Sequence, residues 1–337
     1  MTEPSFSEVN AEKLRFQKIV LLVGTTIMAV KFAAWILTGS VSILTDALDS
    51  IVNVIAAGIG LYALYLSSIP RDSTHPFGHG KIENISSLIE GSMIIVAGLI
   101  IMLEAAERII NPAEIKSLDF GLILIGICAA ANFITGYYAV RKGRKDRSPA
   151  LTAAGKHLCT DTYYSVGIIL ALLVMMILQN MGNDVLWVDG AIAAVCGIVI
   201  IITGAKVVKE SLDSSMDKAD VQIVNEILST LKESRHGDWI DIHNLRVIKY
   251  GSLLHIQMHI VLPRWMTVED QCREFSELKD SIYKVYGDSV DLIVMGDPCT
   301  DDFCIHCSRE CDCRSHEMVS LTEWTVEKIC EEEPSNR

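Results

Sequence analysis

The chain has 337 residues, of which 50% are hydrophobic and 21% are charged, and its mean hydropathy is +0.34. A soluble protein with only 7% aromatic residues is seldom this apolar, so the composition favours an integral membrane protein. The formal net charge of −13 argues against a nucleic-acid partner, because neutralising phosphates requires a basic surface.

Six stretches are long and apolar enough to cross a bilayer, whose hydrocarbon core of about 30 Å takes roughly 20 residues of helix. They are residues 19–37, 41–66, 85–105, 120–140, 153–178 and 186–208. In a soluble protein, these stretches would leave almost no polar helix face for water. We therefore predict a bundle of six transmembrane helices over residues 19–211, preceded by a short cytoplasmic segment, residues 1–18.

Lysine and arginine residues gather at one set of predicted helix ends. The amino-terminal segment and the second-to-third loop carry several, and the fourth-to-fifth loop carries five between Arg141 and Arg147. The loops on the other side either lack them or balance them with acidic residues. Since positive loops stay in the cytoplasm, we expect both termini to be cytoplasmic and the protein to lie in the cytoplasmic (inner) membrane.

A soluble domain is predicted after the sixth span, over residues 212–298. Residues 221–234 and 268–286 have helical spacing, whereas residues 240–250, 252–262 and 289–295 have the pattern of strands. The order helix–strand–strand–helix–strand predicts a small cytoplasmic α+β domain with helices on one face of a sheet. Residues 299–337 are predicted to form a cysteine-rich acidic tail, with a short helix over residues 320–333.

Ionisable residues at membrane depth are costly and point to function. Asp49 and Asn53 are four residues apart, as are His157 and Asp161, so each pair lies on one face of its helix. Two facing helices would then offer two carboxylates, one amide oxygen and one imidazole nitrogen, which suit a divalent first-row metal. A polar contact between helices is the alternative interpretation.

Three further charged residues, Lys31, Asp46 and Glu90, fall within the predicted spans. Asp46 lies a turn closer than Asp49 to the outer end of its helix, which favours a place in the extracytoplasmic vestibule. Lys31 and Glu90 are candidates for structural charge pairs.

Three motifs carry a family resemblance. Residues 42–53 resemble the second helix of the cation diffusion facilitator family, and residues 70–83 are similar to its cytoplasmic signature. His157-x3-Asp161-x3-Ser165 resembles its fifth helix. The resemblance covers residues 12–298, with a ferredoxin-like, metallochaperone-like cytoplasmic domain. It implies a homodimer in the lipid bilayer that exports a divalent cation in exchange for protons, without an organic cofactor.

Asn53 departs from the family pattern, because zinc-transporting members usually have Asp at this position. The amide removes one negative charge and one proton acceptor from the predicted site. Imidazole suits zinc and iron, so His157 favours Zn²⁺ or Fe²⁺ as the substrate, with Mn²⁺ as a further alternative.

The resemblance also implies accessory sites outside the spans. Asp72, His75 and His79 match a second metal site in the second-to-third loop, and a helix-capping loop is the alternative. Lys81 and Asp213 match a charge pair that, in the family, links this loop to the start of the cytoplasmic domain at the dimer interface.

In the cytoplasmic domain, three candidate ligands fall where the family builds a regulatory metal cluster: His243, His259 and Asp297. Gln271 and Met295 occupy positions where relatives can supply His, which argues against a full two-metal cluster. His255 is either a replacement ligand or a surface histidine.

The tail offers five thiols: Cys299, Cys304, Cys307, Cys311 and Cys313. Thiolates suit zinc or a softer metal, although the spacing is not that of a paired zinc ribbon. A reduced thiol tail that binds no metal is the alternative.

Two rival functions fit the composition less well. A membrane-anchored metal sensor without transport would have no use for four polar ligands at membrane depth. A membrane metallohydrolase would need a general base and a substrate cleft, and the sequence has no HExxH motif and no nucleophile elbow. We therefore expect a transporter rather than an enzyme, and the absence of a Walker motif argues against ATP as its energy source.

Overall fold

The computed structural model describes residues 6–38, 41–110, 119–180, 187–251, 253–312 and 314–331. The chain divides into two compact units, Val9–Met216 and the part from Asp217 onwards. Each unit is described by itself.

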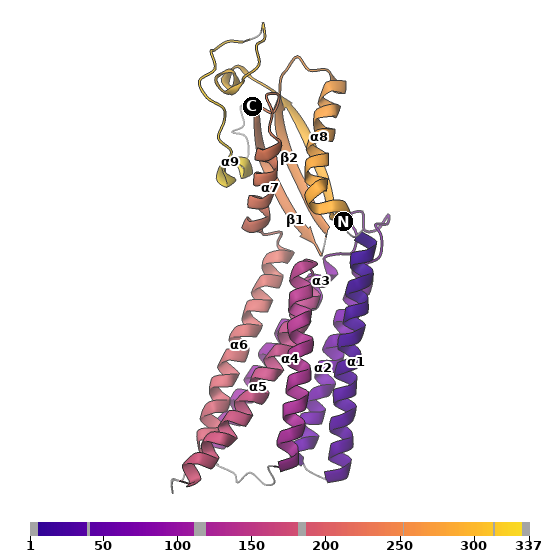
Figure 1. Ribbon diagram of the computed structural model, residues 1–337, viewed down its shortest axis with the longest axis vertical. Coiled ribbons are helices and arrows are strands. Elements are labelled where there is room, and N and C mark those ends of the chain that lie inside the picture. The colour runs from indigo at the N-terminus through magenta and orange to yellow at the C-terminus, as the bar shows by residue number, and fades with distance from the viewer. Residues whose placement is uncertain are drawn as a thin grey trace. The chain divides into compact units, whose positions relative to one another are not determined.

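The first unit is a bundle of long helices (Figure 1). Its helices are α1 (Phe6–Thr38), α2 (Val41–Ser67), α3 (Ile82–Ile110), α4 (Asp119–Lys145), α5 (Pro149–Asn180) and α6 (Trp187–Ser215). Each contains one of the six predicted spans. α1 begins at Phe6, so the helix that contains the first predicted span also includes residues 6–18.

Small residues bring the helices of this bundle close together. A Cβ atom added at Gly155 of α5 would lie 2.8 Å from the carbonyl oxygen of Gly136 of α4. A Cβ atom at Gly98 of α3 would lie 3.2 Å from the carbonyl oxygen of Gly197 of α6. Contacts this close between backbones are typical of helices packed in a membrane, where small residues replace the hydrophobic driving force.

The surface of the bundle is apolar and its interior is partly polar. On α3, Ile85, Val96, Leu99 and Leu103 are each more than half exposed, as expected for side chains that face lipid. Within the described residues, three helical stretches are long and apolar enough to cross a membrane by length and composition: Asn10–Ala33, Ser50–Ser67 and Ile82–Glu107.

A buried ion pair joins several helices at one end of the bundle. Lys13 Nζ of α1 donates to Glu83 Oε1 of α3 at 3.0 Å, and both side chains are 1% exposed. Ser67 Oγ donates to the same carboxylate at 3.0 Å, and Ser148 Oγ donates to its other oxygen. The start of α1, the end of α2, the start of α3 and the α4–α5 connection therefore meet in one network.

The second unit is a small α+β domain with the predicted order of elements. It contains α7 (Val221–Ser234), β1 (Asp241–Tyr250), β2 (Leu253–Leu262), α8 (Val268–Tyr286), β3 (Val290–Pro298) and α9 (Val326–Cys330). The strand order is β1-β2-β3, with β1 antiparallel and β3 parallel to β2. α8 makes the crossover that a parallel pair requires.

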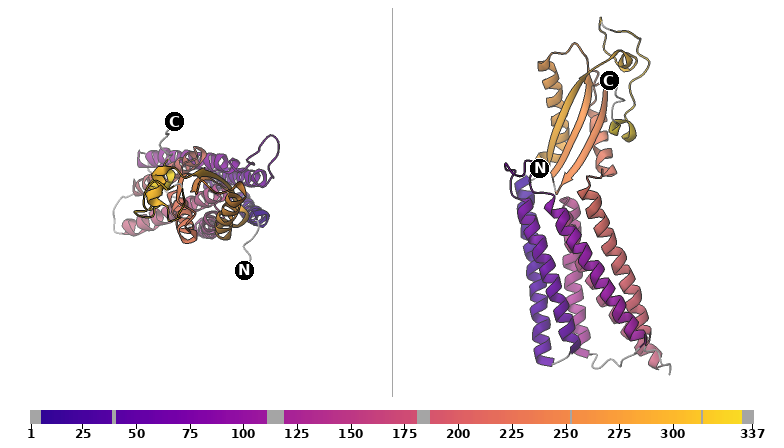
Figure 2. Two further views of the ribbon diagram at one scale, coloured as in Figure 1. Left: turned by 90° about the horizontal axis from the view of Figure 1, so that it is seen from above. Right: turned by 180° about the vertical axis from the view of Figure 1, so that it is seen from behind.

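One face of this sheet is covered by α7 and α8 (Figure 2). Ile227 and Leu231 of α7, Ile256 of β2, and Leu278 and Ile282 of α8 are completely buried in a shared core. Because side chains alternate along a strand, His255, Gln257 and His259 of β2 lie on the opposite face.

The helix predicted over residues 320–333 is shorter than expected. Of the described residues in this stretch, only Val326–Cys330 are helical. Trp324 is 1% exposed, and its Nε1 donates to Asp241 Oδ1 at 3.1 Å, which holds the preceding segment against the core. Thr325 then caps the helix by accepting from the backbone N–H of Lys328.

Candidate transport and metal sites

Three of the four predicted intramembrane ligands come together between α2 and α5. Asn53 lies on α2, one turn after Asp49, and its Nδ2 donates to Asp161 Oδ2 of α5 at 2.6 Å. His157 Nε2 lies 2.8 Å from Asn53 Oδ1, so the imidazole N–H donates to the amide oxygen. Asn53 therefore bridges the imidazole and the carboxylate.

The donor atoms of this arrangement are of the kinds that bind divalent cations. His157 is 5% exposed, and its Nδ1 is buried without a hydrogen-bond partner among the described residues. The Nε2 and amide oxygen atoms are as close as two ligands on one metal ion, and a cation between them would replace their hydrogen bond. The side chains of Asp46 and Asp49 lie outside the described residues.

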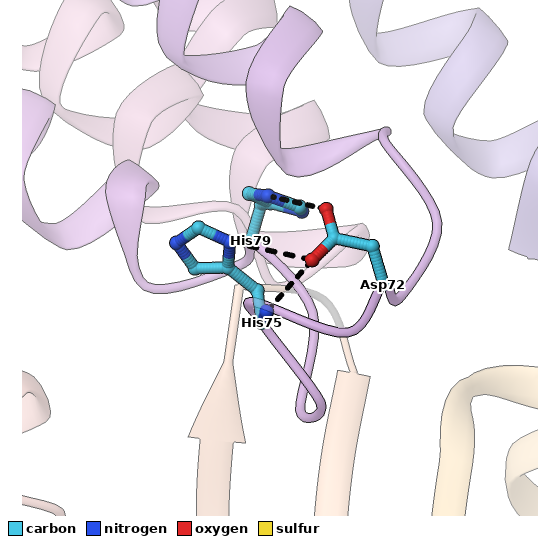
Figure 3. A group of neighbouring side chains, drawn as sticks. All are labelled: Asp72, His75 and His79. Atoms are coloured by element: carbon cyan, nitrogen blue, oxygen red, sulfur yellow. Dashed lines mark hydrogen bonds and ion pairs between the residues drawn. The ribbon is translucent and has the colours of Figure 1, made fainter.

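The predicted loop site is also assembled. His79 Nε2 and His75 Nδ1 lie 3.6 Å from the two carboxylate oxygens of Asp72, and one ligand atom from each residue lies within 4.8 Å of the others. Figure 3 shows the carboxylate pointing toward the two rings, whose centroids are 4.2 Å apart. The site lies in the loop between α2 and α3 and is open to solvent.

Hydrogen bonds keep Asp72 ionised. Thr74 Oγ1 donates to its Oδ1 at 2.6 Å, and the backbone N–H groups of Thr74 and His75 donate at 2.8 and 2.7 Å. The side-chain bond from Thr74, followed by the backbone bond from His75, lowers the pKa of Asp72 to about 2. These bonds make Asp72 the cap of a local turn, whereas the alternative expected a helix cap and the next helix, α3, begins only at Ile82.

The cytoplasmic cluster forms on the sheet face opposite α7 and α8. His243 of β1 and His259 of β2 are directly paired across the two strands. His259 Nδ1 lies 2.8 Å from Asp297 Oδ2 of β3, and His243 Nε2 lies 3.3 Å from the same oxygen. His255 is not part of this cluster, because it pairs with Asp291 at 3.1 Å.

The tail cysteines are not gathered into one site among the described residues. Cys299 and Cys307 are buried with Ile240 and Val261 in a small apolar cluster. Cys304 is also buried and accepts a hydrogen bond from Ser315 at 3.5 Å. Cys313 lies outside the described residues. A metal site formed by the tail thiols therefore stays a prediction.

The sequence patterns do not predict a further polar cluster, which consists of His236, Glu274 and Glu277. His236 Nε2 lies 3.0 Å from Glu274 Oε2 and 3.6 Å from Glu277 Oε2, and Trp239 Nε1 also donates to Glu274. The two glutamates are three residues apart on α8, a signal that the sequence does contain. His236 belongs to the segment before β1, and only the tertiary fold brings it to them.

The predicted charge pair remains a prediction. Lys81 lies at the end of the loop before α3, and Asp213 lies in the last turns of α6. Both residues make polar or electrostatic interactions within the protein.

A helical membrane unit with a polar site in its interior, followed by a small α+β domain, agrees with the comparisons with known proteins. The family described as Cation efflux transmembrane domain matches residues 18–214, and the Cation efflux protein, cytoplasmic domain, matches residues 219–299. The chain therefore belongs to the cation diffusion facilitator family, a family of membrane transporters.

Individual relatives extend over most of the chain. The chain is 33% identical to the transporter sll1263 of Synechocystis sp. over 252 residues, which is 74% of this chain and 80% of the relative. It is 25% identical to the cation-efflux pump FieF of Cronobacter sakazakii and 23% identical to FieF of Shewanella oneidensis. These alignments cover 83% and 81% of this chain and 90% of each pump.

Proposed function

We propose that the protein exports a divalent transition-metal cation, Zn²⁺ or Fe²⁺ in preference to Mn²⁺, in exchange for protons. The observation that carries the proposal is the contact of Asn53 with both His157 and Asp161 inside the bundle. An amide oxygen, an imidazole and a carboxylate at membrane depth also join α2 to α5 by hydrogen bonds, and all three are ligands for such an ion. Asp49 is proposed as the fourth ligand.

The proposal places six spans in the inner membrane, with both termini in the cytoplasm. It assigns Asp72, His75 and His79, and separately His243, His259 and Asp297, to accessory metal sites on the cytoplasmic side. The protein is proposed to act as a homodimer, with Lys81 and Asp213 near its interface. The names of the two FieF pumps, which are cation-efflux pumps, support export.

Proton exchange follows from the imidazole. A metal binds only neutral imidazole, so protonation of His157 from the outer side releases the cation, and loss of this proton restores binding. We expect vesicles containing the purified protein to take up Zn²⁺ faster when their lumen is more acidic than the medium. The His157→Ala variant is expected to lose most of this dependence. Zn²⁺ uptake by the wild-type protein that does not depend on the pH gradient would contradict the exchange of Zn²⁺ for protons.

Replacing Asn53 by Asp tests its part in selectivity. The change keeps the size of the side chain but adds a carboxylate, so a bound cation is balanced by one more negative charge. We expect tighter Zn²⁺ binding, a weaker relative preference for Mn²⁺, and transport that is more sensitive to pH. Burial of the new carboxylate without metal offsets part of the gain. Flux of Zn²⁺, Fe²⁺ and Mn²⁺ at several pH values measures the effect, and identical selectivity in both proteins would exclude Asn53 as a ligand.

The loop site gives a separate prediction. Because the pKa of Asp72 is about 2, this carboxylate stays ionised wherever the histidines are neutral enough to bind metal. Protons should therefore compete with Zn²⁺ at the imidazoles of His75 and His79 and not at Asp72, so Zn²⁺ binding at the loop should weaken in acid. Asp72→Asn should weaken binding about tenfold yet leave it pH-dependent, whereas replacing both histidines by Ala should remove the pH-dependent part. Competition with a Zn²⁺ indicator measures both, and a pH-independent Asp72→Asn protein would refute this assignment.

A further inference from the structure

A small cavity inside the helix bundle links the Asn53–His157 pair to a second acidic residue. Asn53 and His157 line one part of the cavity, and Glu90 of α3 lines another. Ala57 and Ala154 also line it, and their short side chains leave the space open. The cavity thus has polar groups at two places in an otherwise apolar lining.

Glu90 is completely buried, and neither of its carboxylate oxygens has a hydrogen-bond partner among the described residues. Gln17 Oε1 of α1 is likewise buried without a donor. Gln17 Nε2 is fixed by donating to the carbonyl oxygen of Ala57 at 3.0 Å, which leaves Oε1 as the unused acceptor. The hydroxyl of Ser86, one turn before Glu90, is also buried and lies near the Glu90 carboxylate without good hydrogen-bond geometry.

Gly60 of α2 brings the two side chains together. A Cβ atom at this position would lie 2.8 Å from Gln17 Nε2 and 2.9 Å from Glu90 Oε1. Both groups therefore pack against the same glycine, and the missing side chain makes the room that they occupy.

The polar group formed by Gln17, Ser86 and Glu90 can be placed along the helices by its distance from Asn53 and from Glu83. Gly60 lies seven residues after Asn53 on α2, which is about 10 Å along the helix toward the loop between α2 and α3. Glu90 lies two turns into α3 from Glu83, which belongs to the ion pair at the loop end. The group thus lies between the loop end of the bundle and the Asn53–His157 pair.

A carboxylate at membrane depth without a positive partner costs several kcal/mol. One proton on Glu90 would remove its charge and provide one donor for Gln17 Oε1, which still leaves the second carboxyl oxygen of Glu90 without a donor. Oxygen ligands from Glu90 and Gln17 match a divalent cation that keeps some of its water.

We propose that Glu90, with Gln17 Oε1 and Ser86 Oγ, forms a loading site that holds the divalent cation before it reaches Asn53, His157 and Asp161. The role in loading rests on the proposed transport function, whereas the binding of a cation at Glu90 can be tested without transport.

The transport test compares two substitutions of the same kind on α3. Glu90→Gln removes the charge and keeps the shape, and Glu107→Gln changes an exposed carboxylate on the same helix. We expect Glu90→Gln to raise the Zn²⁺ concentration for half-maximal uptake about tenfold, and Glu107→Gln to leave it unchanged. Glu90→Asp, which keeps the charge, should lie between Glu90→Gln and the wild type. Equal values for all of these proteins would overturn the proposal.

The binding test uses dicyclohexylcarbodiimide, which modifies buried protonated carboxyl groups, with mass spectrometry to locate the modified residue. In the Asp161→Ala background, we expect Glu90 to be modified without metal and to be protected by Zn²⁺. Modification that Zn²⁺ does not change, including modification that responds only to pH, would overturn the cation site. So would a Glu90 that is unmodified without metal, because its carboxylate would then already have a partner. Protection by Zn²⁺, together with a wild-type protein that transports no metal, would leave this site standing and refute the proposed function.

Discussion

The Asp161→Ala variant is expected to transport Zn²⁺ at least about 100-fold more slowly than the wild type, although the protein still folds. The carboxylate of Asp161 is one of only two predicted anionic ligands, and it also accepts the 2.6 Å hydrogen bond that orients Asn53. Changing a residue that only hydrogen-bonds to a metal ligand typically lowers the affinity for the metal 10–100-fold. The Asp161→Ala change removes a ligand and, at the same time, a hydrogen-bond partner of another ligand. Uptake of Zn²⁺ into vesicles containing the purified variant measures the loss.

Thr160→Val is the matched control for this change. Thr160 precedes Asp161 on α5, and its hydroxyl donates only to the backbone oxygen of Lys156 at 2.8 Å. The control should transport at close to the wild-type rate. Near-normal transport by Asp161→Ala would show that the cation passes elsewhere.

The Glu83→Gln variant is expected to lose about 3–5 kcal/mol of stability. Glu83 is 1% exposed, and its charge is balanced by Lys13 at 3.0 Å. The amide can still accept from Ser67 and Ser148, but Lys13 loses this buried counter-charge, which water cannot replace. Since 1 kcal/mol shifts the unfolding midpoint of a domain of this size by about 2–4 °C, the midpoint in detergent should fall by roughly 10 °C.

Glu210→Gln provides the comparison for Glu83→Gln. Glu210 accepts from Lys156 at 2.6 Å, but its side chain is 65% exposed, and exposed pairs contribute about 0–1 kcal/mol. Its unfolding midpoint should therefore stay within a few degrees of the wild type. Equal shifts of the unfolding midpoint in the two variants would mean that burial does not determine how much the Lys13–Glu83 pair contributes to stability.

Local patterns in the sequence predict much of this protein. Apolar stretches of about 20 residues predict the six long helices, and alternation predicts the three strands in their order. The spacing of four residues between His157 and Asp161 predicts that they share a helix face, and the structure places Asn53 in contact with both. These predictions succeed because they depend on helix and strand periods alone.

Contacts between helices are not predicted from the sequence, because they depend on which faces of the helices are turned toward one another. Gln17 and Glu90 come from different helices and meet only because Gly60 of a third helix leaves room for both. Residues 6–18 carry several polar and charged side chains, and the burial of Lys13 depends on its ion pair with Glu83 of another helix. The helix predicted over residues 320–333 does not include residues 320–325, where Trp324 packs into the core.

The position of a bound ion tests the central claim most directly. Crystals of the protein grown with Zn²⁺ and measured at the zinc absorption edge should show an anomalous peak between α2 and α5. The ion is expected at about 2.0–2.2 Å from His157 Nε2 and from a carboxylate oxygen of Asp161. Peaks confined to the loop residues Asp72, His75 and His79 and to the cytoplasmic cluster, in crystals saturated with Zn²⁺, would contradict an intramembrane site at Asn53, His157 and Asp161.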